Sequence, residues 1–194
     1  MIASSSFLYH HTQAFLHSHL YSTKDWRATS LSLPSTALFD ADGIHGNIDE
    51  ILNVPLTVQI GFWAGQVLKT EAHNKAGVVI LGQDSQNYGE ILAIALATGL
   101  TGAGLDVWHL GLCPNPAVAY VTSISEAIGG VMISASHYPP EDNGIKFFNA
   151  HGSKLNSQLQ AQIEAGLRGK KNVEDYDDEL GKQYYRRELL HYFE

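Results

Sequence analysis

A strand-like run of apolar residues ends in a serine, a histidine and two prolines in the segment GGVMISASHYPPEDNGIKFF, residues 129–148. Ser136 at such a strand end can be a nucleophile or only a capping residue. His137 follows it, but adjacent residues of an extended chain point in opposite directions, so we do not expect direct proton transfer between them. The G-x-S-x-G elbow of serine hydrolases is absent from the sequence, which disfavours acyl transfer. Lys146 on the next strand supplies the positive charge that a phosphoryl group needs.

Strand and helix signals alternate between residues 37 and 170, and these elements must position the serine. The pattern predicts an α/β fold with a mostly parallel, mixed sheet that helices cover on both faces. The expected strands are 77–82, 106–112, 129–134 and 144–150, after a short strand that passes into a loop within 37–47. The expected helices are 55–71, 90–105, 117–127 and 153–168, the last capped by Ser153 or Asn156.

Loops at the carboxyl ends of strands gather at one edge of such a sheet. The loops 40–47, 83–89 and 134–143 each follow an expected strand, so we predict that they converge. In the helix 90–105 we expect burial of Leu92, Ile94, Ala95 and Leu100. The glycines at 99, 102 and 104 are interpreted as the end of this helix rather than a phosphate loop, because no Lys-Ser or Lys-Thr follows them.

Composition limits the classes of partner. The chain has 194 residues and a formal net charge of −8, which argues against nucleic acid or anionic membranes as partners. No apolar run approaches the roughly 20 residues that a membrane helix needs. Cys113 is the single cysteine, so no intramolecular disulfide forms and nothing requires an oxidising compartment. We therefore expect a cytoplasmic location.

The two ends of the chain differ from the middle. Residues 1–36 are rich in Ser and His and are predicted to form a disordered or loosely packed extension, with an organelle transit segment as the alternative. The histidines in this extension are expected to be incidental rather than metal ligands. Residues 171–194 are highly charged and are predicted to form a linker and the start of a following domain; a cation site at 174–179 is the alternative.

The segment ISASHYPPEDNGIKFF resembles the phosphoserine loop of the α-D-phosphohexomutases, whose pattern is S-A-S-H-N-P followed by D-N-G-x-K. Three further segments agree in order. LFDADGIHGN resembles the family pattern F-G-T-D-G-I-R-G, the segment from 78 to 107 resembles the G-x-D-x-R region and its helix, and LGLCPNPAVAY resembles G-x-x-P-T-P. The resemblance covers residues 37–194, and the amino-acid sequence of these segments is most similar to the phosphoglucosamine mutase branch of the family. It implies the three-layer α/β/α architecture of domain I of that family.

The resemblance also implies a mechanism of phosphoryl transfer. Ser136 would carry a phosphoryl group, give it to a hexose phosphate and recover the other phosphoryl group from the bisphosphorylated sugar. For this branch, glucosamine 6-phosphate and glucosamine 1-phosphate would interconvert. The phosphoryl oxygen on Ser136 would bind Mg²⁺, Lys146 would assist acid–base transfer and His137 would shape the loop. Expected substrate- or phosphate-binding positions are His45, Gln86 and Asn143.

Three positions depart from the family pattern. His45 and Gln86 stand where the family has arginine, and Tyr138 replaces asparagine. Gln lacks the permanent charge and fork of Arg, and His is charged only in part near pH 7. The metal, sugar and phosphate loops of the other three family domains are not found, so we expect little activity from this chain alone unless those domains are supplied in trans. The alternatives are a non-catalytic sugar-phosphate-binding or regulatory module, or a relic fragment.

Overall fold

The structure, a computed structural model, describes residues 33–48, 50–73, 77–134, 139 and 142–170. All of them belong to one compact unit, Leu33–Glu194. Among these residues, no helix combines the length and the apolar character needed to cross a membrane. The predicted extension up to residue 32, the charged segment from 171 and the loop residues 135–138 lie outside the described residues, so the boundaries predicted there stay predictions.

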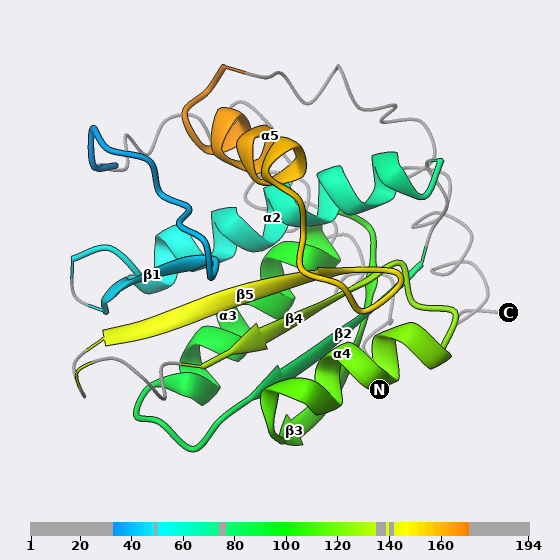
Figure 1. The fold of residues 1–194 in the computed structure, drawn as a ribbon. Helices are drawn as coiled ribbons and strands as arrows, with labels where there is room; N and C mark the ends of the chain where they lie inside the picture. The colour runs from blue at the N-terminus through cyan, green and yellow to red at the C-terminus, as the bar shows by residue number, and fades with distance from the viewer. Residues whose placement is uncertain (1–32, 49, 74–76, 135–138, 140–141, 171–194) are drawn as a thin grey trace, which may run out of the picture. The chain divides into compact units, whose positions relative to one another are not determined.

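Five strands form one mixed sheet in the order β1-β5-β4-β2-β3 (Figure 1). β2 pairs in parallel with β3 and β4, whereas β5 pairs antiparallel with both β4 and β1. The strands are β1 (Ile44–Asn47), β2 (Val78–Gln83), β3 (Asp106–Leu112), β4 (Gly129–Ile133) and β5 (Asp142–Asn149). The four strands predicted from Gly77 onward are confirmed within a residue or two, and β3 is an exposed edge strand.

Two consecutive glycines of β4 show that helices cover both faces of the sheet. A Cβ on Gly129 would lie 2.8 Å from the Leu68 side chain of α2 (Val54–Glu71), whereas a Cβ on Gly130 would lie 2.3 Å from Thr122 of α4 (Asn115–Ile124). α3 (Gly89–Gly102) packs beside α2, and α5 (Ser157–Leu167) packs on the outer side of α2. The predicted three-layer α/β/α fold is therefore confirmed.

The α2–α3 contact depends on glycine. A Cβ on Gly99 would fall 2.0 Å from the Val58 carbonyl oxygen, so this position allows the two helix backbones to approach closely. Gly99 lies in the last turn of α3, where its carbonyl accepts the Ala103 N–H, and Gly102 is the last residue of the helix, so the predicted helix end is confirmed. Ile94 was expected to be buried but is 62% exposed, because the buried side of α3 is formed by Leu92, Leu96 and their helical neighbours.

The first strand differs from its prediction. The expected strand before residue 40 is reduced to one isolated bridge between Phe39 and Ile44, and residues 44–47, predicted as loop, form β1. The cause is a tight turn at 40–43. The Asp40 carboxylate accepts the backbone N–H groups of Asp42 and Gly43, at 2.7 and 3.0 Å, and the chain then reverses into β1.

Asparagine caps two of the helices. The side chain of Asn53 accepts the Leu56 N–H at the start of α2, with Pro55 in the first turn as predicted. Asn156 does the same for the Leu159 N–H at the start of α5. Of the two predicted caps for this last helix, Asn156 is thus the one that is used.

Candidate functional site

The ends of β2 and β4 and the start of β5 are joined at the carboxyl edge of the sheet. The Asp84 N–H donates to the Ile133 carbonyl at 3.0 Å, and the Ser134 N–H donates to the Gly144 carbonyl at 2.9 Å. The Asn143 side-chain amide donates to the Asn87 carbonyl at 3.0 Å. The predicted convergence of the loops 83–89 and 134–143 is confirmed for their described residues. The third predicted loop, 40–47, reaches the start of β5 through its residues 46–47, which pair with residues 143 and 142.

Ser136 and His137 lie outside the described residues, but both ends of their loop are described. The loop connects the antiparallel strands β4 and β5, and Ser134 on the β4 side is buried. A Cβ on Gly144 would lie 2.7 Å from the Ser134 carbonyl oxygen, so glycine is needed for the two strands to approach here. The loop that carries the predicted phosphoserine therefore starts and ends on a closely paired hairpin.

Lys146 and His45 lie on the same face of the sheet. Lys146 pairs with Met132, and His45 pairs with Gly144, two residues before Lys146. Met132 is buried in the core under α4, so strand alternation directs Lys146 and His45 to the α4 face. Diagonal neighbours of this kind have Cβ atoms about 7–8 Å apart, a spacing that one phosphate group can bridge.

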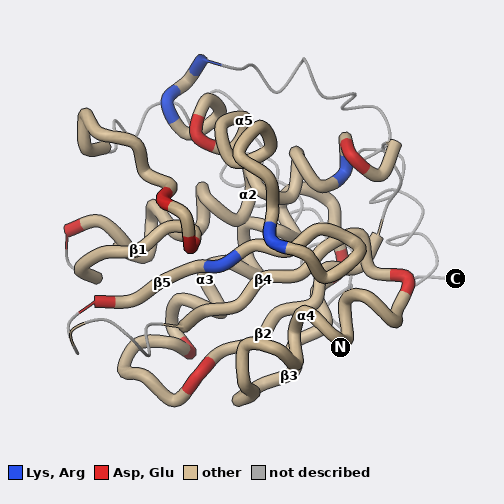
Figure 2. The backbone as a smooth tube through the Cα atoms, viewed as in Figure 1, with Lys and Arg blue, Asp and Glu red and all other residues tan. Residues whose placement is uncertain are grey.

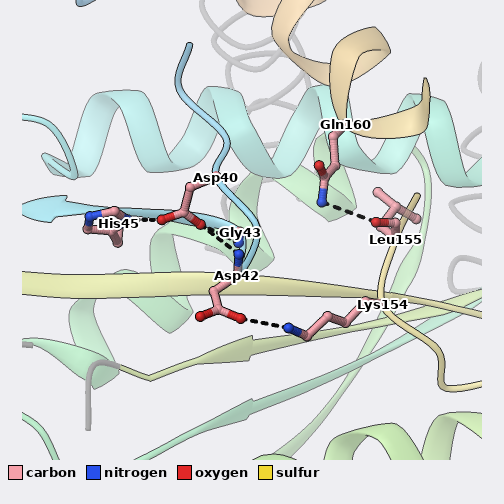
Figure 3. Close-up of polar contacts among 7 residues, drawn as sticks. All are labelled: Asp40, Asp42, Gly43, His45, Lys154, Leu155 and Gln160. Atoms are coloured by element: carbon pink, nitrogen blue, oxygen red, sulfur yellow. Dashed lines mark hydrogen bonds and ion pairs between the residues drawn. The ribbon is translucent and has the colours of Figure 1, made fainter. Parts of the chain in front are cut away.

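The turn at 40–43 completes a shallow hollow on this face, formed with His45 and with residues 144–146 of β5. The His45 imidazole Nδ1 lies 2.7 Å from the Asp40 carboxylate, and Lys154 Nζ lies 2.6 Å from the Asp42 carboxylate (Figure 3). Within the described residues, the half-buried Lys146 ammonium has no hydrogen-bond or ion-pair partner. The hollow thus combines one unpaired cation, one imidazole and two carboxylates that are already engaged.

Acidic positions cluster around β1 and a basic position lies in the middle of β5 (Figure 2). Residues of both strands line the hollow. An anion in the hollow would therefore meet a positive charge as well as negative ones, although the net charge of the chain is negative. Since Lys154 neutralises Asp42 and His45 contacts Asp40, the remaining positive charge is that of Lys146.

The two remaining predicted binding residues have different environments. Gln86 is exposed in the turn 84–88, where its backbone N–H donates to the Asp84 carboxylate at 2.9 Å, and it does not line the hollow. Asn143 is 1% exposed, and both ends of its amide are used inside the chain, one on Asn87 and the other on the Gly144 N–H. The direct role predicted for these residues in ligand binding stays a prediction, and the geometry gives Asn143 a supporting contact between two loops.

Comparison with known proteins now adds to this geometry. Residues 36–174 match the family described as phosphoglucomutase/phosphomannomutase, alpha/beta/alpha domain I. The chain belongs to this family. It is 58% identical over 168 residues to the phosphoglucosamine mutase of Trichodesmium erythraeum (strain IMS101), a match that covers 87% of this chain and 34% of that protein.

A second phosphoglucosamine mutase, from Trichormus variabilis, is 60% identical over 160 residues, which cover 82% of this chain and 32% of that protein. The chain thus spans about a third of the length of these curated relatives. A phosphoglucomutase/phosphomannomutase family protein from Burkholderia thailandensis shares the fold, with a TM-score of 0.61, 24% identity and coverage of 69% of this chain and 30% of that one.

The described part of this phosphohexomutase domain does not by itself fit a metal. No group of three or more His, Cys, Asp or Glu side chains comes together among the described residues. Asp40 and Asp42 are the carboxylates of the hollow, and their oxygens are engaged by backbone N–H groups, His45 and Lys154. We therefore derive no step through Mg²⁺ from these residues.

Sequence reasoning missed two polar residues of the hollow, Asp40 and Asp42, and Asp40 is the one that contacts His45. Its signal was present in the spacing D-A-D-G, since an aspartate two residues before another polar residue and three before a glycine is typical of a side-chain-capped turn. The contact between Asp40 and His45 follows from that turn. It joins residues five apart, which face each other only because the chain reverses between them.

Proposed function

We propose that this chain supplies the phosphoserine domain of a phosphoglucosamine mutase, with Ser136 as the phosphoryl carrier. The observation that carries the proposal is the S-A-S-H segment with Lys146 downstream, in a chain about 60% identical to proteins named phosphoglucosamine mutase. The hairpin geometry supports it, because Ser134 and Gly144 hold the two ends of the loop together. Because both ends of this short loop are held on paired strands, the distance between a phosphoryl group on Ser136 and β5 is limited.

The proposed reaction transfers a phosphoryl group twice. The C1 hydroxyl oxygen of glucosamine 6-phosphate forms a bond to the phosphorus on Ser136, the bond from phosphorus to the serine oxygen breaks, and a proton passes from the sugar hydroxyl to the serine. The resulting bisphosphorylated sugar turns, and its 6-phosphoryl group returns to Ser136, which leaves glucosamine 1-phosphate. Each transfer moves one phosphoryl group and one proton, so no other reactant is consumed.

Lys146 has the chemistry that this transfer requires from the described residues. Its position on β5 fixes its distance from the start of the strand, where the loop joins. Among the described residues this ammonium has no carboxylate partner, so it can attract the charge that develops on the phosphoryl oxygens and can move a proton. His45 on the same face is the second candidate for contact with a phosphate.

Several finer points remain part of the proposal. The choice of glucosamine phosphate over another hexose phosphate follows only from the names of the relatives. Mg²⁺ is expected on the phosphoserine oxygen, with protein ligands from outside the described residues. The remaining mutase domains are expected as partners, in the same polypeptide or in trans, and the location is expected to be cytoplasmic.

Intact-protein and fragment mass spectrometry after incubation with glucosamine 1,6-bisphosphate tests the proposal. We expect one added phosphoryl group, assigned by fragment ions to Ser136 and not to the buried Ser134 two residues before it. Ser136→Ala should abolish the addition. Exposed Ser157, at the start of α5, offers a control variant, because it follows the end of β5 that is opposite to the loop, so Ser157→Ala should leave phosphorylation unchanged. Modification that persists in Ser136→Ala would remove the proposed carrier.

A further inference from the structure

Both carboxylate oxygens of Asp40 are used, one within the turn at 40–43 and the other on His45 of β1. Oδ1 accepts the backbone N–H groups of Asp42 and Gly43, at 2.7 and 3.0 Å, and Oδ2 lies 2.7 Å from Nδ1 of His45 (Figure 3). The backbone N–H of Asp40 also donates to the Gly43 carbonyl at 2.8 Å. The imidazole is therefore attached to a carboxylate that the turn itself holds in place.

This contact determines which imidazole nitrogen carries a proton. An ionised carboxylate can only accept hydrogen bonds, so Nδ1 must be the N–H donor in both the neutral and the charged imidazole. Nε2 is then the nitrogen that changes, from an acceptor in the neutral form to a donor in the charged form. A hydrogen bond between the ring and a ligand would therefore use Nε2, which lies on the side of the ring away from Asp40.

The contact contributes little to stability. The two side chains are 40% and 41% exposed, and an ion pair at that exposure typically contributes only about 0–1 kcal/mol. The turn bonds of Oδ1 would hold the chain reversal without any histidine. A role in orienting the ring therefore accounts for the contact better than a role in folding does.

The charged groups around the ring favour a phosphate as the ligand on this side. Lys146 of β5 lies on the same face, and Lys154 pairs with Asp42 and neutralises the second carboxylate of the turn. Asp40 is neutralised in part when His45 is protonated. The family pattern quoted above has glycine and arginine where this chain has Asp40 and His45, so the carboxylate and the imidazole that meet here are both departures from that pattern.

We propose that Asp40 is a positioning residue, which holds the His45 imidazole with Nδ1–H bound to its carboxylate so that Nε2 is presented to a phosphate group of the ligand. The identity of that ligand as a sugar phosphate rests on the function proposed above; the positioning itself does not. Protonated His45 then donates to the phosphate from a fixed direction, while neutral His45 presents a lone pair that repels it.

Asp40→Asn separates orientation from turn formation. The amide oxygen of asparagine can still accept the two turn N–H groups, but its NH₂ group then faces Nδ1 and donates to it. The neutral imidazole should change from the Nδ1–H to the Nε2–H tautomer, while the turn and the thermal midpoint stay close to those of the wild type. Long-range ¹H–¹⁵N spectra of the full chain, recorded with the imidazoles neutral, report the tautomer directly.

The spectra need one assignment and one control. His45→Gln identifies the His45 signals by their loss, and exposed His109 on the edge strand β3 should keep one tautomer in both proteins. We expect wild-type His45 as Nδ1–H and Asp40→Asn as Nε2–H. A wild-type ring that is mainly Nε2–H, or an Asp40→Asn ring with an unchanged tautomer, would overturn the proposal.

Ligand binding is measured in the same spectra by titration with glucosamine 6-phosphate and, in parallel, with inorganic phosphate, at a pH where His45 is charged. Asp40→Asn should bind about three- to tenfold more weakly than the wild type, because the ring loses its fixed direction. Equal affinity in the two proteins, or an absence of binding in the wild type, would overturn the role in presentation. The tautomer and the affinity do not depend on phosphorylation of Ser136. These measurements therefore test the positioning role of Asp40, whereas the mass spectrometry experiment tests the proposed function.

Discussion

Gly43 is the last residue of the turn at 40–43 and lies against β5, so its substitution by alanine is the most direct perturbation of the hollow. Its φ of +129° lies outside the small left-handed helical region that other residues occasionally occupy. A Cβ at this position would fall 2.2 Å from the backbone carbonyl oxygen of Ile145. Since that oxygen belongs to a paired strand, the turn and not the strand must move.

The magnitude follows from two separate costs. Holding a non-glycine residue at an unfavourable positive φ costs about 1–3 kcal/mol. Overpacking against rigid neighbours costs about 1–3 kcal/mol more. Gly43→Ala should therefore lower the free energy of unfolding by about 2–6 kcal/mol, and the displaced turn should separate Asp40 from His45.

Gly111 is the matched control, because it also has a positive φ, +71°, but no atom lies within 4 Å of its Cβ position. Gly111→Ala retains only the backbone cost of about 1–2 kcal/mol, reduced by up to about 1 kcal/mol through the lower entropy of the unfolded chain. Urea unfolding followed by circular dichroism measures both variants. Gly43→Ala that is no less stable than Gly111→Ala would refute the argument that close approach to β5 requires glycine here.

Three other variants test the rest of the domain. Gly99→Ala should destabilise the fold by about 2–4 kcal/mol, because its Cβ would lie 2.0 Å from a backbone oxygen of α2, whereas Gly102→Ala, with only one contact at 3.9 Å, should be neutral or slightly stabilising in the same urea assay. Asn143→Ala leaves the Gly144 N–H and the Asn87 carbonyl without their partner, so thermal unfolding should show a free energy of unfolding lower by about 1–3 kcal/mol. Hydrogen exchange of the backbone amides should become faster in the loop 83–89. Unchanged exchange would show that the Asn143 amide does not hold this loop. Burial raises the pKa of the Cys113 thiol, against a smaller lowering by its hydrogen bond with the backbone of Gln83. The neutral thiol is thus favoured in the folded state. Its contribution to stability is complete below the ordinary thiol pKa and is lost as the pH rises through the raised pKa. The difference in unfolding free energy between wild type and Cys113→Ser should shrink over that pH range, and a constant difference would contradict this prediction.

The sequence was sufficient for the elements with strong periodicity. Continuous apolar runs such as 77–82 predict a strand buried on both faces, and Pro55 after Asn53 marks the start of a helix through chemistry that is local to the chain. The convergence of two loops followed from the rule that parallel strands end at one edge. These predictions depend on short-range patterns, which a single sequence contains.

Other features depend on contacts that no local pattern specifies. Burial of Ile94 was predicted from its apolar side chain, but which side of α3 faces the sheet is decided by packing against α2. β1 was predicted as loop because Gly43 and Gly46 interrupt its sequence, and only pairing with β5 makes it a strand. Asp40 was missed although the spacing D-A-D-G signals its turn, because its contact with His45 exists only after the turn has formed.

β5 has a consequence beyond its place in the sheet. The loop with Ser136 joins it at one end, Lys146 lies in its middle, and the strand β1, which pairs directly with β5, carries His45. A strand bonded on both sides bends very little, so the spacing between Lys146 and the backbone of His45 is set when the domain folds. Any adjustment to a bound ligand must then come from parts of the protein that move relative to this strand.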